Sequence, residues 1–251
     1  MKLIRHGLRL AWRAMLRIKH SPEQLLDLSL SPIMFVTLFV FLFGIAVAGN
    51  WHAYLQFVLP GVAVQSLLFA SMGTAVGLNT DLRSGIFDRF RSLPIARTAP
   101  LLGHVLGDFF RYLVTLVVVL GYGFVLGFRL RGSVLAVLAA IGLMVLFSFA
   151  MSWPSSIIGL LAKTPTSVQG YSFLILFPLT FGSNIFVPTA KLPGWLQAWV
   201  KVNPVTQLSN AVRGLMLDQP IGATASHALL WSLAIVVVFA PVAGWIYRRI
   251  I

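Results

Sequence analysis

The sequence predicts an all-α integral membrane protein with six transmembrane helices, an N-terminal amphipathic interfacial helix, and short outer re-entrant helices between spans five and six. Three observations lead to this fold class. The 251 residues are 58% hydrophobic and only 10% charged, with a mean hydropathy of +0.90, whereas soluble domains contain about 25% charged residues. The few charged residues are clustered, and long uncharged stretches separate the clusters. Those stretches lack the period-two alternation of a membrane β-barrel strand.

Five uncharged stretches provide the six spans. A bilayer core of about 30 Å requires about 20 helical residues. Residues 28–80 form a first stretch of 53 uncharged residues, which is long enough for two spans joined by a turn at Gly49-Asn50-Trp51-His52. The other four stretches provide one span each, at 112–128, 132–162, 164–190 and 219–247.

The basic residues predict the orientation of these spans. With the N-terminus in the cytoplasm, 14 of the 19 Lys and Arg residues lie on the inside and 5 on the outside. The positive-inside rule favours this topology, in which the C-terminus is also cytoplasmic. Anionic lipid headgroups account for the net charge of +13. We therefore expect membrane lipids as partners and no nucleic acid.

The chain is predicted to be one transmembrane domain, 1–251, that begins with an interfacial helix at 1–27. Four Arg residues recur at every fourth position along one face of this helix, and Trp12 lies on another face. Such a helix lies in the membrane surface with its Arg side chains at the phosphates. It acts either as an orientation anchor or as a docking element for a partner. The residues concerned are Arg5, Arg9, Trp12, Arg13 and Arg17.

The cytoplasmic segment 79–100, between spans two and three, combines both signs of charge with exposed aromatic residues. Asp81 and Asp88 are two of only six carboxylates in the chain. Phe87 and Phe90 are three residues apart, so they share one helix face, and Pro94 ends that helix. This composition suits docking into a groove on another protein. The alternative is an interfacial loop whose Phe side chains dip into lipid.

The outer segment 188–225 is predicted to contain two short helices. Pro193 and the pair Asn203-Pro204 are helix-start signals, because Asn caps a helix and Pro fits its first position. A helix over 204–217 has 14 residues, too few to cross a bilayer. Trp195 and Trp199 are expected at the membrane interface. The alternative is a plain extracellular loop.

Catalytic and cofactor signatures are missing from the sequence. It has no Cys, no G-x-x-x-x-G-K-[ST] loop and no H-E-x-x-H, so we expect no catalytic, cofactor or metal site in this chain. None of the spans contains a carboxylate, which argues against a buried proton relay. Asp108 and Arg111 are expected to pair near the inner end of span three. The Ser residues in the spans suit helix packing or a conduit lining better than an intramembrane hydrolase.

Three segments together resemble a known family. They are Leu59-Pro60-Gly61, then Ser84-Gly85-Ile86-Phe87-Asp88-Arg89-Phe90-Arg91-Ser92-Leu93-Pro94, and Asn203-Pro204-Val205-Thr206 with Ala211, Val212 and Arg213 further on. The chain resembles the membrane subunit of a type-2 ABC transporter, and in particular the daunorubicin-resistance permeases of actinobacteria. The inner-loop segment is the most specific of the three.

The resemblance implies a permease subunit of an ATP-driven exporter for a hydrophobic drug, an antibiotic or a complex lipid, in the inner membrane of a bacterium. It implies two permease copies working with two separate ATPase subunits, which bind ATP and Mg. The segment 79–100 would then be a cytoplasmic coupling loop, in which Asp81–Pro94 would form the coupling helix that docks on the ATPase. Its docking residues would be Asp81, Arg83, Ile86, Phe87, Asp88, Arg89, Phe90 and Arg91. Spans two and five would line the dimer interface and a substrate path at Gln65, Ser66, Phe69, Phe177, Phe181 and Asn184.

Other functions remain open at this point. A lipid- or polysaccharide-specific exporter would share the same fold. An ATP-independent, proton-coupled carrier would transport without any ATPase partner. An intramembrane enzyme would depend on one essential membrane Ser for turnover.

Overall fold

The computed structural model describes residues 22–84 and 99–250. Every regular element in this part of the chain is helical, which confirms the all-α class for these residues. The elements are α2 (Pro22–Ala48), α3 (Trp51–Ala70), α4 (Met72–Arg83), α6 (Ala99–Val125), α7 (Val134–Leu161), α8 (Pro165–Phe181), the 3-10 turn η1 (Thr189–Lys191), α9 (Gly194–Val202), α10 (Pro204–Leu217) and α11 (Thr224–Ile250).

Within the described residues, five helical stretches are long and apolar enough to cross a membrane. They are Ser29–Ala48, Trp51–Arg83, Gly103–Val125, Val134–Leu161 and Thr224–Ile250. Helix α8, in the predicted fifth span, has only 17 residues and is not among them. The protein is thus a multi-pass membrane protein with five candidate spans in its described part. The count of six and the re-entrant course of the outer helices stay predictions.

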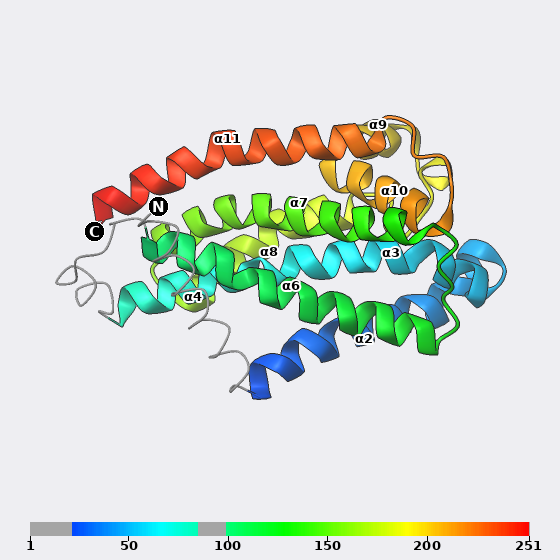
Figure 1. The fold of residues 1–251 in the computed structure, drawn as a ribbon, viewed down its shortest axis with the longest axis horizontal. Coiled ribbons are helices and arrows are strands. Elements are labelled where there is room, and N and C mark those ends of the chain that lie inside the picture. The colour runs from blue at the N-terminus through cyan, green and yellow to red at the C-terminus, as the bar shows by residue number, and fades with distance from the viewer. Residues whose placement is uncertain (1–21, 85–98, 251) are drawn as a thin grey trace.

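The long element formed by α3 and α4 lies inside the bundle (Figure 1). In an apolar segment of 18 residues within this element, 67% is buried, whereas the corresponding segments of α2 and α11 are 22% and 17% buried. Helices α2 and α11 therefore form the periphery. The α3–α4 junction lies at Ser71, whose hydroxyl donates to the Leu68 carbonyl at 2.7 Å. Helix α4 approaches α7 closely at Gly159, where a Cβ would meet the Ala75 carbonyl oxygen at 2.5 Å.

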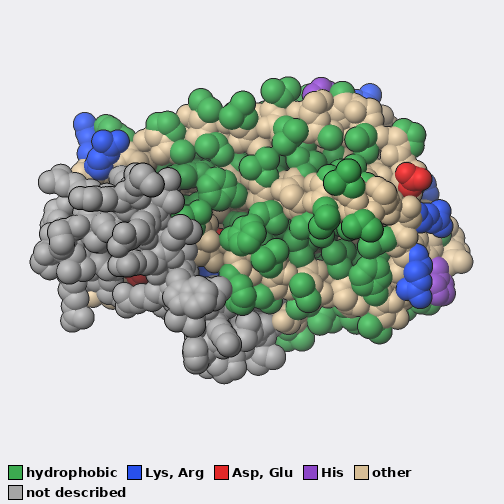
Figure 2. Space-filling view, in the orientation of Figure 1, with side chains coloured by type: hydrophobic (Ala, Val, Ile, Leu, Met, Phe, Trp, Pro, Cys, Tyr) green, Lys and Arg blue, Asp and Glu red, His purple; other side chains and the backbone are tan. Residues whose placement is uncertain are grey.

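Apolar side chains cover the long sides of the molecule. Figure 2 shows this belt, with Lys and Arg side chains gathered mainly toward the two ends. Leu42 on α2 and Val237 on α11 are 67% and 62% exposed. Large exposed apolar surfaces are unusual on soluble monomers, and lipid contact accounts for this one.

Local capping fixes several helix starts that the sequence predicts. Gly49 has a φ of 70°, and Asn50 accepts a hydrogen bond from the His52 amide at the start of α3. The predicted turn is therefore confirmed at Gly49 and Asn50, whereas Trp51 and His52 already belong to α3. Asn203 caps α10 by accepting from the Val205 amide at 2.8 Å. The bounds of α10, Pro204–Leu217, are those predicted from the Asn-Pro signal.

Two predicted segments are organised differently in the structure. Helix α4 runs on to Arg83, so residues 79–83 are helical and do not belong to a loop. They continue the helix because its buried side still packs between α6 and α7, with Asn79 and Asp81 buried. At the N-terminal end, Pro22 begins α2, so 22–27 belong to the first long helix and not to a separate interfacial one. Proline at the first helical position is favourable.

Candidate functional site

A ladder of phenylalanine rings connects α2, α3 and α8. The centroids of Phe177 and Phe181 are 4.3 Å apart, and those of Phe173 and Phe177 are 5.1 Å apart. Phe69 of α3 meets Phe173 at 6.0 Å, and Phe39 of α2 meets Phe181 at 6.3 Å. Phe173 and Phe177 are 50% and 42% exposed. Three of the predicted path residues therefore belong to one apolar, partly exposed aromatic surface, with Phe173 as the link that the sequence analysis missed.

The other predicted path residues lie in different surroundings. Ser66 is half-buried. Gln65 is only 2% exposed, and neither of its amide atoms has a hydrogen-bond partner among the described residues. Asn184 belongs to a polar cluster, in which its amide donates to Asn210 Oδ1 at 2.6 Å beside Arg213.

A polar cluster ties α4 to α6 and α7 near the end of α4. His104 Nε2 lies 3.0 Å from Asp81 Oδ2. Asn79 donates to the carbonyls of Gly159 and Ala162 at 2.9 and 2.8 Å, and Arg83 donates to the Ala162 carbonyl as well. Asp81 is only 6% exposed, so its carboxylate lies within the helix packing and not on an open surface.

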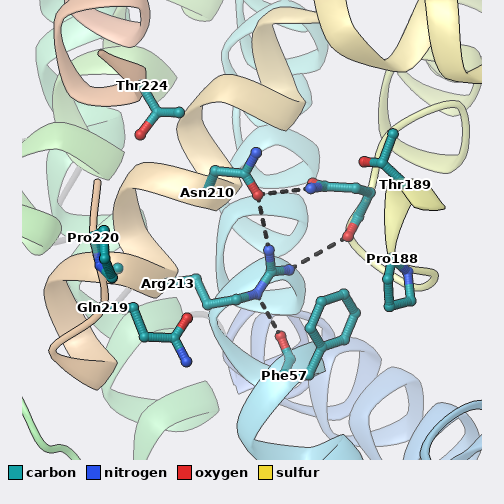
Figure 3. A pocket seen from close by; sticks show the side chains of 10 residues that line it. Phe57, Pro188, Thr189, Asn210, Arg213, Gln219, Pro220 and Thr224 are labelled. Carbon is teal, nitrogen blue, oxygen red and sulfur yellow. Dashed lines mark hydrogen bonds between the residues drawn. The ribbon is translucent and has the colours of Figure 1, made fainter. Parts of the chain in front are cut away.

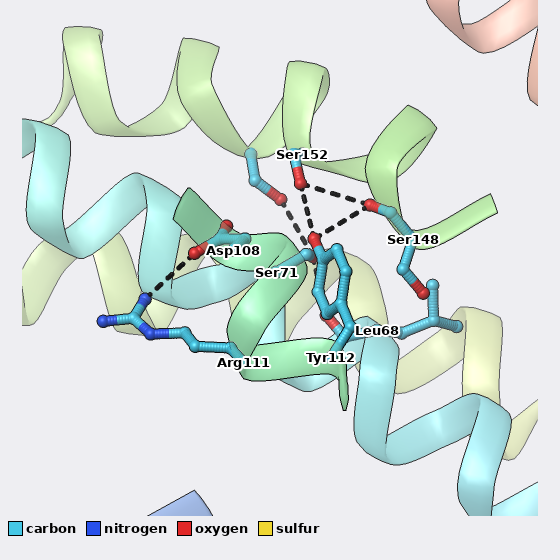
Figure 4. A network of polar contacts seen from close by, with 8 residues as sticks. Leu68, Ser71, Asp108, Arg111, Tyr112, Ser148 and Ser152 are labelled. Atoms are coloured by element: carbon cyan, nitrogen blue, oxygen red, sulfur yellow. Dashed lines mark hydrogen bonds and ion pairs between the residues drawn. The ribbon is translucent and has the colours of Figure 1, made fainter. Parts of the chain in front are cut away.

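A second polar network joins α6 to α7 (Figure 4). Arg111 donates to Asp108 Oδ1 at 3.2 Å, which confirms the pairing predicted from their spacing. The Tyr112 hydroxyl lies 2.6 Å from Ser152 Oγ and 3.2 Å from the Ser148 carbonyl oxygen. Ser148 and Ser152 are buried here in helix–helix packing, one of the two roles expected for the Ser residues in the spans.

A pocket of about 360 Å³ lies where α10 meets α3 and the segment after α8. Arg213 lies at the centre of its lining in Figure 3. Its guanidinium donates to the Phe57 carbonyl, to Asn210 Oδ1 and to the Asn184 carbonyl, and it lies 4.0 Å from the centroid of the Phe57 ring. Burial lowers the pKa of Arg213 to about 10, so the side chain remains protonated at neutral pH.

The sequence analysis did not predict this pocket, although Arg213 was part of a family-like segment. One signal was available. Arg213 and Asn210 are three residues apart and therefore share a face of the predicted short helix, next to the apolar pair Ala211-Val212, which the structure buries completely. An Arg beside buried apolar residues points toward a polar contact inside the fold.

Several predicted site residues lie outside the described residues. They are Ile86, Phe87, Asp88, Arg89, Phe90 and Arg91 of the docking set, and Arg5, Arg9, Trp12, Arg13 and Arg17 of the N-terminal helix. Of the docking set, only Asp81 and Arg83 are described.

The bundle, its apolar exterior and the spacing of its polar clusters define a multi-pass membrane protein. Residues 7–217 match the family described as ABC-2 type transporter. The chain belongs to this family, which confirms the resemblance drawn from the inner loop and the outer segment.

Three curated relatives carry drug-resistance names. The chain is 43% identical over 238 residues to "Daunorubicin resistance ABC transporter permease protein DrrB1" of Streptomyces coeruleorubidus, covering 95% of this chain and 84% of the relative. It is 29% identical to "Probable doxorubicin resistance ABC transporter permease protein DrrC" of Mycobacterium tuberculosis, over 87% and 79% of the two chains. It is 27% identical to "Doxorubicin resistance ABC transporter permease protein DrrB" of the same organism, over 78% and 65%. All three are permease proteins of ABC transporters.

Proposed function

We propose that this chain is the permease subunit of an ATP-driven exporter that moves a hydrophobic drug or a complex lipid across the inner membrane of a bacterium. The match to daunorubicin resistance permease over 95% of the chain carries this proposal. The sequence has no phosphate-binding loop, so the proposal places ATP and Mg on a separate ABC ATPase subunit. Two copies of each subunit would form the transporter. A lipid- or polysaccharide-specific exporter of the same family is the second candidate.

The ATPase is proposed to dock on the segment that follows α4. The described cluster of Asn79, Asp81 and Arg83 supports this assignment, because it links the start of the segment to α6 and α7 through hydrogen bonds. A movement of this segment, driven by the ATPase, would thus be transmitted directly to α6 and α7. Phe87 and Phe90 are proposed as the apolar contacts with the ATPase.

The docking proposal is tested by co-purification. The double substitution Phe87→Ala with Phe90→Ala should remove the ATPase from the tagged permease and abolish ATP-driven export, while permease yield in the membrane is unchanged. The matched control is Phe109→Ala with Phe124→Ala, two Phe side chains of α6 that are 52% and 40% exposed. Normal complex yield and export in the Phe87/Phe90 variant would remove this segment as the docking site.

The aromatic surface of α2, α3 and α8 is proposed to line the dimer interface and substrate path. Its support is a row of contacting aromatic rings on a partly exposed, apolar face, a surface that suits amphiphilic substrates. Phe177→Ala should lower export of a hydrophobic drug without lowering the amount of assembled protein. Leu230→Ala on α11, a similarly exposed apolar position, is the control. Equal effects of the two substitutions would argue against this path.

Helix α8 is proposed to cross the membrane as span five and so to complete the six spans, because 17 residues lie at the short end of the range for a transmembrane helix. The absence of Cys from the sequence makes single introduced thiols unambiguous reporters. A Lys163→Cys variant should react with a membrane-impermeant maleimide only from the cytoplasm, and Lys191→Cys only from outside. Labelling of both positions from one side would refute the crossing. Accessible tags at both termini from the cytoplasm would support the proposed orientation.

A further inference from the structure

The guanidinium of Arg213 is buried, and it has no counter-ion among the described residues. Arg213 is 7% exposed, and among the described residues no carboxylate lies within 4.0 Å of it. Its three hydrogen-bond partners are two backbone carbonyls and one amide oxygen. A guanidinium has five N–H donors, so one N–H on each terminal nitrogen remains unused.

Burying a cation is costly unless it is paired. The Phe57 ring at 4.0 Å and the three oxygens offset part of this cost. These groups are neutral, so the pocket keeps a full positive charge at neutral pH. A small anion that entered the pocket would recover the missing charge pairing through the two unused N–H groups.

The remaining lining of the pocket is built for such an anion. No acidic residue lines it, and its other polar side chains are neutral. In Figure 3 the Oδ1 of Asn210 faces the guanidinium, and its amide nitrogen, on the other side of the same side chain, makes none of the hydrogen bonds found among the described residues. Asn210 therefore offers one unused donor in the lining of the pocket. Asn184 is 5% exposed, and its Oδ1 is a buried acceptor without a partner among the described residues, which suits the hydroxyl of a protonated oxyanion or of a headgroup.

We propose that this pocket binds a phosphate-type oxyanion, held by Arg213 with help from Asn210 and Asn184. Arg suits this ligand because its planar fork matches two oxygens of a phosphate at once. A cationic amphiphile is disfavoured by the buried positive charge. The site is independent of the proposed export function, because binding requires neither an ATPase nor a transported drug. The oxyanion belongs either to a phospholipid headgroup or to a soluble phosphate, and both present the same group to Arg213.

Binding is measured on the purified full-length chain in a phosphate-free maltoside detergent. One arm measures the binding of radiolabelled inorganic phosphate by equilibrium dialysis. A second arm adds phosphatidylglycerol, or a diglucosyl diacylglycerol of the same acyl chains, and counts retained lipid by native mass spectrometry. The key variant is Asn210→Asp, which places a carboxylate 3.1 Å from the Arg213 guanidinium. This variant keeps the shape of the side chain and supplies the counter-ion internally.

The wild-type chain should bind at least one of the two phosphate-bearing probes in preference to the glycolipid. Asn210→Asp should weaken that binding by about tenfold or more, with an unchanged or raised unfolding temperature. Arg213→Gln should also abolish binding. Because this substitution can impair folding, the result for Asn210→Asp decides whether the proposal holds. Arg129→Gln, at an exposed Arg of the α6–α7 turn, should bind as the wild type does.

The two arms distinguish the sources of the oxyanion. Binding of phosphatidylglycerol alone would assign the site to a lipid headgroup. Binding of inorganic phosphate, with or without the lipid, would assign it to a soluble oxyanion. A wild-type chain that binds neither probe better than the glycolipid would overturn the proposal, and so would Asn210→Asp binding with wild-type affinity.

Discussion

Replacing Asn203 by Ala removes a side chain that closes the ends of two helices at once. Its Oδ1 accepts from the Val205 amide at 2.8 Å and so caps the N-terminus of α10. Its Nδ2 donates to the carbonyls of Leu179 and Gly182, both at 2.9 Å. The latter two lie at the C-terminal end of α8, where helical carbonyls lack partners within the helix. Asn203 is only 1% exposed, so water does not readily replace it.

The expected loss of stability follows from these three hydrogen bonds. Loss of an N-cap side chain costs about 1 kcal/mol. Each buried carbonyl left without its partner costs about 1 kcal/mol, at the low end of the range because a carbonyl oxygen has a second lone pair. Asn203→Ala should therefore destabilise the chain by about 3 kcal/mol. For a chain of this length that corresponds to a fall in unfolding temperature of about 6–12 °C, on the scaling known for soluble domains.

The assay is thermal unfolding of the purified chain in detergent, with three variants compared. Asn203→Ser keeps a capping oxygen but is too short to bridge to α8, so we expect it to lose about 2 kcal/mol. Gln207→Ala, about one turn further along α10, controls for amide removal, because its amide makes only one exposed hydrogen bond, to the Lys201 carbonyl. A loss below about 1 kcal/mol for Asn203→Ala would refute the double-cap reasoning. A Ser variant as unstable as the Ala variant would show that the cap contributes nothing.

Two further substitutions test the packing of α7, and each has a matched control. Gly159→Ala should destabilise the chain by about 1–3 kcal/mol, because the new Cβ would meet the Ala75 carbonyl oxygen at 2.5 Å. The control is Gly142→Ala in the same helix, where a Cβ would have nothing within 4 Å; it should be neutral or stabilising in the same melting assay. Equal melting temperatures of the two variants would argue against the close approach of α4 and α7. Tyr112→Phe should lower the free energy of chemical unfolding by about 1–2 kcal/mol, because the hydroxyl that it removes is buried with two hydrogen-bond partners. The control, Tyr171→Phe at an exposed position, should leave the free energy of unfolding unchanged. An equally unchanged Tyr112→Phe variant would show that the network does not stabilise the fold.

The sequence alone determined the class of protein, because in a membrane the composition must match the solvent. Uncharged stretches of about 20 residues have few other uses, and they located all five candidate spans, with Val134–Leu161 predicted to within two residues at each end. The third candidate span was predicted less well: it begins at Gly103, nine residues before the expected 112, and it contains Asp108, so the expectation that no span contains a carboxylate was wrong. Capping signals are equally local. Asn203-Pro204 predicted α10 to the residue, since a cap depends on the side chain and the backbone amides beside it.

Segments near the membrane surface were predicted less well. The helix that was expected to end near residue 79 continues to Arg83, because Asp81 finds His104 on α6 and Asn79 finds the end of α7. Those partners lie 23 and 80 residues away in the sequence. A charge pattern read along one chain segment shows that a carboxylate is present, but it does not show which helix lies beside it.

The residues of the candidate site differ in the same way: contacts within one helix could be predicted from the sequence, whereas contacts between distant segments could not. Pairing of Asp108 with Arg111 was predictable, because three residues of helix bring their side chains together. The Arg213 pocket was not, because it is assembled from α3, the segment after α8, and α10. Sequence fixes which residues carry charge and which can cap or span. Only tertiary packing decides whether a given charge meets lipid, a counter-charge or an empty pocket, because that outcome depends on residues that are distant in the chain and adjacent in the fold.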